Sequence, residues 1–384
     1  MKKLFILLIT FICFFPVLAS ADNLPLAPNA KSAILIEAST GKVIFEKEAD
    51  MKLAPASMTK MMSMLLIMES IEKDILKWDQ MITVSKNASG MGGSQILLET
   101  GEQMSVEDLF KGVAIASGND AVVALAEAIG GSEENFVLMM NKKAKELGLT
   151  NSNFKNSHGL DEVNHYSSAR DMSIIARELV KHEKVLEYTS IYETYLRENL
   201  DTKVWLVNTN KLVRFKEGVD GLKTGHTNSA GYCITVTAKK DKMRLISVVM
   251  KEESANLRNS EASELLDYGF AQFEVEVMLD KEAILGKKEV NKGKKRYVEI
   301  ITKEDVTFLN KKSDAKIMPT YDIKVNTLKA PIKKGDIVGK LYVYDNKNLL
   351  KEVDLTVKED IEKANIIELY LRNLNDVLIG NIEI

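Results

Sequence analysis

Cysteine is nearly absent from this 384-residue chain, which holds only Cys13 and Cys233. Cys13 lies inside an apolar N-terminal run, so Cys233 is the one cysteine outside that run. A single cysteine excludes a disulfide framework, and the domains must therefore be held together by their apolar cores. A chain of this length is long enough for two such domains.

A strong excess of charge of either sign is also lacking. The chain has 52 basic and 55 acidic residues, a formal net charge of −3. Removal of the N-terminal run takes away Lys2 and Lys3 and no acid, which leaves 50 basic against 55 acidic residues. This mild charge argues against a nucleic-acid partner. No set of His, Asp, Glu and Cys has the spacing of metal ligands, so neither a metal nor another cofactor is predicted.

The N-terminus has the pattern of a secretory leader. The stretch MKKLFILLITFICFFPVLASA places two lysines before an apolar run that ends in Ala19-Ser20-Ala21, a small-x-small cleavage signature. The alternative is a membrane-spanning helix, for which the run is short. We predict that residues 1–21 are a signal peptide and that the protein works outside the cytoplasm, on the cell-wall side of the membrane.

Residues 22–274 are predicted to form one α+β domain. Hairpin patterns lie near both ends, in AILIEASTGKVIFEKEAD and in GYCITVTAKKDKMRLISVVM, and helical patterns dominate between them. The strands from the two ends are expected to share one antiparallel sheet, with the helical lobe beside it.

Residues 275–360 read as a small all-β domain, because short β-like runs alternate with Lys, Asn, Gly and Pro turns. Residues 361–384 are predicted to be an amphipathic helix with Ile367, Tyr370 and Leu374 on its apolar face. This helix is suited either to a membrane surface or to packing on a protein. Its net charge of −2 is unusual for a surface-binding helix, which is usually basic, so both alternatives stay open.

A lysine follows a serine by three positions at the start of the apolar segment LAPASMTKMMSMLLIM, residues 53–68. Positions i and i+3 share one face of a helix, so Lys60 is expected to reach Ser57. An amine buried among apolar side chains gives up its proton more readily, and a neutral lysine is a base that activates a serine nucleophile. Of five S-x-x-K matches in the chain, this one opens an apolar helix after a proline.

Two further short motifs follow in the chain. Ser117-Gly118-Asn119 lies between two helical patterns, and its alternative interpretation is an N-cap for the second helix. Lys223-Thr224-Gly225-His226 leads toward a hairpin, with a glycine where a ligand backbone can approach closely. Its alternative interpretation is an ordinary turn.

In the order S-x-x-K, S-x-N, K-T-G, these elements resemble the serine acyl-transferase signature of penicillin-binding proteins and β-lactamases. The stretches TGK at 40–42, PASMTK at 55–60, NSHGLD at 156–161 and DGLKTGHT at 220–227 are similar to those of low-molecular-mass D-alanyl-D-alanine carboxypeptidases. The resemblance covers residues from about 30 to 275. It implies a penicillin-binding-protein/β-lactamase-like transpeptidase domain, and the trailing β domain and terminal helix suit the same family.

The resemblance also implies roles for the matched residues. Ser57 would attack the carbonyl between the two terminal D-alanines of a peptidoglycan stem peptide, and unprotonated Lys60 would take its proton. Ser117 and Lys223 would relay a proton to the leaving nitrogen. Asn119 would bind the substrate amide and hold Lys60.

Other positions would bind the substrate. The backbone N–H groups of Ser57 and His226 would form the oxyanion hole. Thr224, Gly225 and His226 would line the cleft with Lys223, and Arg258 would bind the substrate carboxylate. Some family members have an arginine where this chain has Thr209, so recognition of the carboxylate is expected to differ in detail. β-Lactam antibiotics would acylate Ser57 and leave slowly.

Several other side chains are expected to have structural roles. His158 is expected to brace the site rather than act as a base, and Cys233 is expected to be buried. Glu133 and Glu134 look like a solvated helix end. The methionines of the opening helix are expected to fill core, namely Met58, Met61, Met62, Met64 and Met68.

Three other functions are alternatives to a carboxypeptidase. A class A β-lactamase would carry an E-x-x-L-N stretch, and this chain has none. A non-catalytic wall-binding protein would not need to keep the serines and lysines of all three motifs. A D,D-endopeptidase acting on peptide cross-links stays open, because the motifs do not separate it from a carboxypeptidase.

Overall fold

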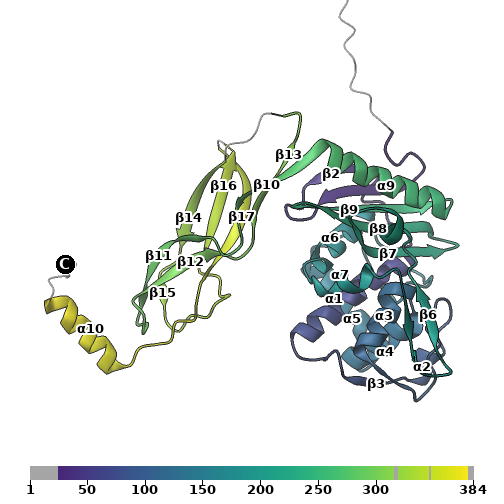
Figure 1. Ribbon diagram of the computed structural model, residues 1–384, viewed down its shortest axis with the longest axis horizontal. Coiled ribbons are helices and arrows are strands. Elements are labelled where there is room, and N and C mark those ends of the chain that lie inside the picture. Colours follow the sequence, from purple (N-terminus) through teal and green to yellow (C-terminus); the bar gives the residue numbers. More distant parts are fainter. Residues whose placement is uncertain (1–24, 315–318, 346, 379–384) are drawn as a thin grey trace, which may run out of the picture.

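The structure is a computed structural model that describes residues 25–314, 319–345 and 347–378. The predicted signal peptide, residues 1–21, lies outside the described residues. Figure 1 shows a larger body of helices and sheet, a smaller body of strands, and a helix near the C-terminus.

The larger body is built on a five-stranded antiparallel sheet in the order β2-β1-β9-β8-β7. These strands are β1 (Ser32–Glu37), β2 (Val43–Lys47), β7 (Val219–Thr227), β8 (Gly231–Lys240) and β9 (Met243–Glu252). The first two and the last three strands of this body thus lie in one sheet. The prediction that both sequence ends share an antiparallel sheet beside a helical lobe is confirmed.

Helices and two small two-stranded sheets complete the larger body. The helical segments are η1 (Ala56–Thr59), α1 (Lys60–Glu72), α2 (Lys86–Ser89), α3 (Val106–Lys111), η2 (Gly112–Ala116), α4 (Asn119–Gly130), α5 (Glu133–Glu146), α6 (Ala169–Leu179), α7 (Lys184–Thr189), α8 (Leu212–Phe215) and α9 (Ala255–Gln272). The two-stranded sheets pair β3 (Met81–Thr83) with β4 (Gln103–Ser105) and β5 (Glu193–Leu196) with β6 (Val204–Val207).

Between its polar end residues Ser32 and Glu37, strand β1 is apolar because both of its faces are covered. Ile34 and Ile36 pack with the core of the helical lobe. Leu35 points to the opposite face and packs with Leu265 and Leu266 of α9. Alternate side chains of a strand point to opposite faces, so a strand buried on both sides reads as a continuous apolar run.

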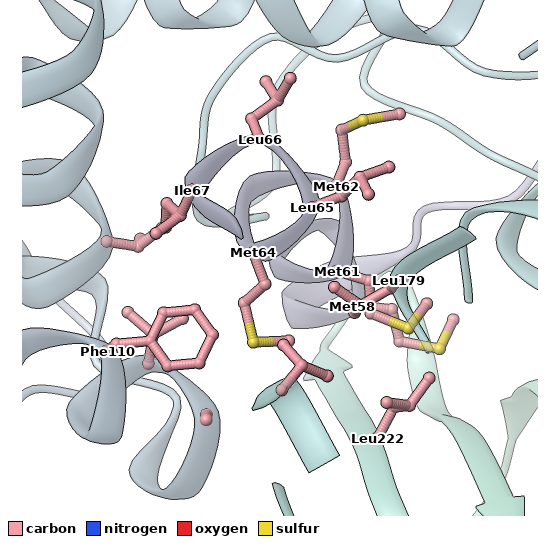
Figure 2. Close-up of a cluster of buried hydrophobic side chains, with 14 of the residues drawn as sticks. Met58, Met61, Met62, Met64, Leu65, Leu66, Ile67, Phe110, Leu179 and Leu222 are labelled. Carbon is pink, nitrogen blue, oxygen red and sulfur yellow. The ribbon is translucent and has the colours of Figure 1, made fainter. Parts of the chain in front are cut away.

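Helix α1 runs through the centre of the helical lobe, and Figure 2 shows its apolar side chains pointing in several directions around the helix axis. All five methionines of η1 and α1 are buried, which confirms their predicted core role. A helix that is apolar all round is a buried helix. Its first residue, Lys60, is therefore held inside the protein together with them.

The smaller body consists of strands with their own apolar core. Strand β10 (Phe273–Leu279) pairs with β13 (Val306–Lys311). The six-stranded sheet has the order β14-β16-β17-β12-β11-β15. Its strands are β11 (Ile284–Asn291), β12 (Tyr297–Thr302), β14 (Thr320–Val325), β15 (Leu328–Lys329), β16 (Gly339–Asp345) and β17 (Asn348–Val357).

Helix α10 (Ile366–Leu378) follows the smaller body. The apolar side chains of Ile367, Tyr370 and Leu374 are exposed on it. In the described part of the chain, no helix has the length and apolar character that crossing a bilayer requires. Whether α10 lies on a membrane surface stays a prediction.

Candidate active site

Ser57 lies in the short 3₁₀ turn η1, directly before α1, and its side chain is partly exposed. The turn is packed against β7. A Cβ added at Gly225 of β7 would lie 2.7 Å from the Pro55 carbonyl oxygen and 3.1 Å from the Ser57 nitrogen. The glycine of the K-T-G motif thus allows β7 to approach the backbone of the serine turn.

Lys60 is completely buried, and its amine has three oxygen neighbours. Its Nζ lies 2.6 Å from Asn119 Oδ1, 2.8 Å from the His158 carbonyl oxygen and 3.1 Å from Ser57 Oγ. Burial holds the pKa of Lys60 well below its ordinary value, and the nearby charge of Lys223 lowers this pKa further, against an opposing effect of Asp120. The amine is therefore suited to be neutral.

A neutral amine has two N–H groups and one lone pair. The Asn119 and His158 oxygens accept the two N–H groups, so the lone pair faces the Ser57 hydroxyl. Asn119 is itself held in place, since its Nδ2 donates to the Gly92 carbonyl at 2.6 Å. This arrangement is one in which Ser57 can lose its proton to Lys60.

Ser117 ends the π-helical turn η2 with a positive φ of 66°, an unusual backbone conformation for a serine. Its hydroxyl is buried and has no hydrogen-bond partner among the described residues. Within this motif, Gly118 occupies the N-cap position of α4, and no side chain makes a capping hydrogen bond there. The Ser117 hydroxyl is therefore available to a bound molecule.

Strand β7 carries the remaining predicted site residues. Lys223 is buried, its Nζ donates to the Thr224 carbonyl at 3.0 Å, and burial together with the charge of Arg258 lowers its pKa to about 7. The Thr224 hydroxyl donates to the Thr209 hydroxyl at 2.8 Å. His226 is exposed, and its ring lies 4.1 Å, between centroids, from that of Tyr232.

The described structure thus gathers the predicted residues from four distant parts of the sequence. Ser57, Lys60 and Asn119 are in direct contact. Lys223 is near enough to lower the pKa of Lys60, and Arg258 is near enough to lower that of Lys223. Among the residues described, no three acidic, histidine or cysteine side chains gather to hold a metal ion.

The family model described as D-alanyl-D-alanine carboxypeptidase, peptidase family S11, matches residues 19–254. The model of the C-terminal domain of penicillin-binding protein 5 matches residues 273–363. This chain belongs to the D-alanyl-D-alanine carboxypeptidase family. It is a serine hydrolase by membership of that family.

Individual relatives cover most of this carboxypeptidase-family chain. The D-alanyl-D-alanine carboxypeptidase DacF of Bacillus subtilis is 49% identical over 91% of the chain and 90% of its own length. A crystal structure of penicillin-binding protein 5 from Haemophilus influenzae is 33% identical, covers 87% of this chain and 98% of that one, and has a TM-score of 0.69. The ampicillin-bound form of penicillin-binding protein D2 from Listeria monocytogenes is 30% identical, covers 65% and 99%, and has a TM-score of 0.58.

In this family member, the sequence patterns do not predict the position of one acidic residue near the site, Glu133. Glu133 was expected at a solvated helix end, but its side chain is only 16% exposed and accepts hydrogen bonds from Ser157. That prediction is wrong for Glu133, whereas Glu134 is exposed. A charged residue in the first turn of a helix has an ordinary local explanation, so nothing in the sequence pattern marks Glu133.

Two histidines near Thr59 and Lys60 are buried. His158 is buried, which lowers its pKa to about 4, and its carbonyl rather than its ring contacts Lys60. His165, which carried no signal in the sequence, has its Nε2 2.8 Å from the Thr59 hydroxyl. Cys233 is buried as expected, and burial raises its pKa to about 11.

Proposed function

We propose that this chain is an exported serine D,D-carboxypeptidase that removes the terminal D-alanine from peptidoglycan stem pentapeptides through an acyl-enzyme on Ser57. The observation that carries the proposal is the environment of Lys60. Its Nζ lies 2.6 Å from Asn119 Oδ1, 2.8 Å from the His158 carbonyl oxygen and 3.1 Å from Ser57 Oγ, so a neutral amine that donates to the first two directs its lone pair at Ser57. Export rests on the leader pattern of residues 1–21.

The proposed reaction proceeds in two stages. Ser57 Oγ bonds to the carbonyl carbon of the penultimate D-alanine as its proton passes to Lys60. The C–N bond then breaks, and the leaving D-alanine nitrogen receives a proton through Ser117 and Lys223. A water molecule next adds to the ester carbonyl, which releases the shortened peptide and restores the Ser57 hydroxyl.

Substrate binding is assigned to the exposed edge of β7. This strand is the last of its sheet, so one row of its backbone groups does not face β8 and an extended peptide can pair with it. The N–H groups of Ser57 and His226 form the proposed oxyanion hole. Lys223, Thr224 and Arg258 supply the proposed recognition of the terminal carboxylate, with Thr209 beside them.

We also propose a role for each part of the chain. Residues 22–274 carry the chemistry, residues 275–360 form an accessory β domain, and residues 361–384 follow as the terminal helix. The named substrates of the relatives, D-alanyl-D-alanine peptides, and the ampicillin bound by the Listeria protein support a peptidoglycan substrate and covalent binding of β-lactams.

The test is mass spectrometry of the protein after incubation with penicillin, together with an assay of D-alanine release from a stem pentapeptide. We expect one long-lived adduct mapped to Ser57 and release of one D-alanine per peptide. The Ser57→Ala variant should form no adduct and release none, a loss of at least about 10³-fold. Rapid penicillin turnover would instead indicate a β-lactamase.

A D,D-endopeptidase is the second candidate, because the same acyl-enzyme chemistry cleaves a cross-link. A cross-linked muropeptide dimer, offered beside the pentapeptide at equal concentration, separates the two activities. The carboxypeptidase proposal is contradicted if the dimer is cleaved and the pentapeptide is left intact.

A further inference from the structure

The segment from Asn156 to Gly159 is held between helices α1 and α5. From α1, Lys60 contacts the His158 carbonyl oxygen at 2.8 Å and the Ser63 hydroxyl donates to the Ser157 carbonyl at 2.6 Å. From α5, one carboxylate oxygen of Glu133 accepts from the Ser157 N–H at 2.9 Å and from the Ser157 hydroxyl at 2.7 Å. The segment is therefore fixed from both sides.

The same carboxylate also faces the His158 ring. The Nδ1 of His158 accepts from the Leu160 N–H at 3.1 Å, so the ring proton of the neutral imidazole is assigned to Nε2. That nitrogen lies 3.6 Å from Glu133 Oε1. Both donors of Ser157 thus bind one carboxylate oxygen, and the His158 ring nitrogen lies beside it.

Glu133 is not needed to begin its own helix. The Ser132 hydroxyl already caps α5 by accepting from the Asn135 N–H. A carboxylate that is largely withdrawn from water costs free energy unless it makes hydrogen bonds of this kind. The position of Glu133 is therefore explained by what it binds on the neighbouring segment.

That segment also touches the turn that carries the nucleophile. Gly159 has a φ of +89°, and a Cβ added there would lie 1.9 Å from the Ala56 carbonyl oxygen. A displacement of residues 157–159 would thus move both the acceptor of Lys60 and the support of Ser57. With the His158 carbonyl displaced, nothing would direct one N–H of the Lys60 amine.

We propose that Glu133 is a positioning residue for the general base: it orients residues 157–158 so that the His158 carbonyl directs the lone pair of Lys60 toward Ser57. The inference rests on the proposed function of Ser57 and Lys60. It assigns to Glu133 no contact with the substrate.

The test compares Glu133→Ala with the wild type in penicillin acylation at saturating antibiotic, across the pH range. We expect the maximal acylation rate to fall ~10–100-fold, as misplacement of a catalytic group does, with less than about twofold change in apparent binding. Loss of the carbonyl acceptor makes the ammonium form of Lys60 less favourable. The acid limb of the pH profile should therefore move to lower pH.

Two further variants give the matched comparison. Glu134→Ala removes the exposed neighbouring carboxylate and should leave both rate and pH profile unchanged. Glu133→Gln keeps an acceptor oxygen for Ser157 and should restore the rate to within about fivefold of the wild type. Titration of the active sites with penicillin gives the folded fraction, by which each rate is divided.

A wild-type rate and an unmoved acid limb in Glu133→Ala would overturn the inference, as would an equal effect in Glu134→Ala. If Glu133→Ala does not fold, Ser157→Ala decides, because it removes one of the donors to Glu133. In Ser157→Ala, a smaller shift of the acid limb to lower pH supports the inference, and an unmoved acid limb overturns it. Failure of the proposed function is distinct, because then the wild-type protein itself would form no adduct at Ser57.

Discussion

At the scale of single residues, the charge of Lys60 is decided by what surrounds its amine. An ordinary lysine is protonated at neutral pH and has no lone pair to accept a proton. Here the side chain is completely buried and a second lysine lies nearby, and both effects disfavour the ammonium form. The charge of Lys223, the proposed proton donor, thus favours the neutral form of Lys60, the proposed general base.

Arg258 allows a test of how neighbouring charges set the protonation of Lys223. Burial and the charge of Arg258 lower the pKa of Lys223 to about 7. In Arg258→Gln the neighbouring cation is gone, so Lys223 should keep its proton to higher pH. If Lys223 donates that proton, the alkaline limb of the acylation profile should move upward by about half a pH unit or more.

The measurement is the penicillin acylation rate at saturating antibiotic between pH 5 and about 10. Arg214→Gln is the control, because Arg214 is exposed and its guanidinium stacks on Tyr192. An alkaline limb that stays in place in Arg258→Gln would show that Arg258 does not set the protonation of Lys223.

At the scale of elements, the site depends on how closely β7 approaches η1. In Gly225→Ala the new methyl group would lie 3.0 Å from the Ala56 Cβ and 2.7 Å from the Pro55 carbonyl oxygen. The turn that carries Ser57 should therefore shift, and a displacement of about 1 Å lowers the rate ~100-fold. Acylation kinetics measure this effect, while circular dichroism should show a folded protein.

Gly92→Ala is the matched control for that substitution. An added Cβ at Gly92 would meet no atom within 4 Å, although the Gly92 carbonyl accepts from Asn119 at the site. Acylation by Gly92→Ala should stay within about threefold of the wild type. Equal losses in the two variants would show that the close approach of β7 is not what matters.

The junction of β9 and α9 contains a second buried acidic group, outside the site. Glu252 is 2% exposed, and burial beside Glu261 raises its pKa to about 8. Its pKa in the unfolded chain is the ordinary value of 4.5, so the folded state binds the proton more tightly. This contribution to stability is complete below that value and is lost as the pH rises through about 8.

We therefore expect thermal stability of the wild type to fall between neutral pH and pH 9, measured by calorimetry. Glu252→Gln should remove most of this slope and be more stable than the wild type at pH 9 by about 1–3 kcal/mol. Glu253→Gln, at the exposed neighbouring position, should keep the wild-type slope. The same slope in Glu252→Gln would contradict titration of Glu252 as its cause.

At the scale of the whole molecule, the two bodies have separate apolar cores joined by a small contact. The core of the β domain contains side chains of its own sheet, such as Leu341, Val343 and Leu355. The Ser39 hydroxyl lies 2.8 Å from that of Thr307, and Leu309 of β13 packs with the core beside α9. Figure 1 shows the two bodies meeting near β10 and β13.

Separate cores predict separate unfolding. Calorimetry of the whole protein should show two transitions, and acylation by penicillin should raise the temperature of one by several degrees, because the attached acyl group makes noncovalent contacts only with the folded larger body. The other transition should stay within about 1 °C. A single transition that moves as a unit would show that the contact through Ser39, Thr307 and Leu309 couples the two bodies.

The sequence by itself determined the features that depend on neighbours along the chain. The spacing of Ser57 and Lys60 brings them together because three residues make nearly one helical turn. Alternation and turn residues predicted the hairpins, and the all-round apolar character of α1 predicted a buried helix. The motifs identified the family.

Tertiary structure alone decided which distant groups meet. Glu133 and its partner Ser157 are 24 residues apart in the sequence. Asn119 and His158, which contact Lys60, are 59 and 98 residues from it. Local periodicity carries no information on such pairs, because they depend on how helices and sheet pack. For the same reason the free hydroxyl of Ser117 and the low pKa of Lys223 follow from burial in the folded protein, which no single stretch of the chain contains.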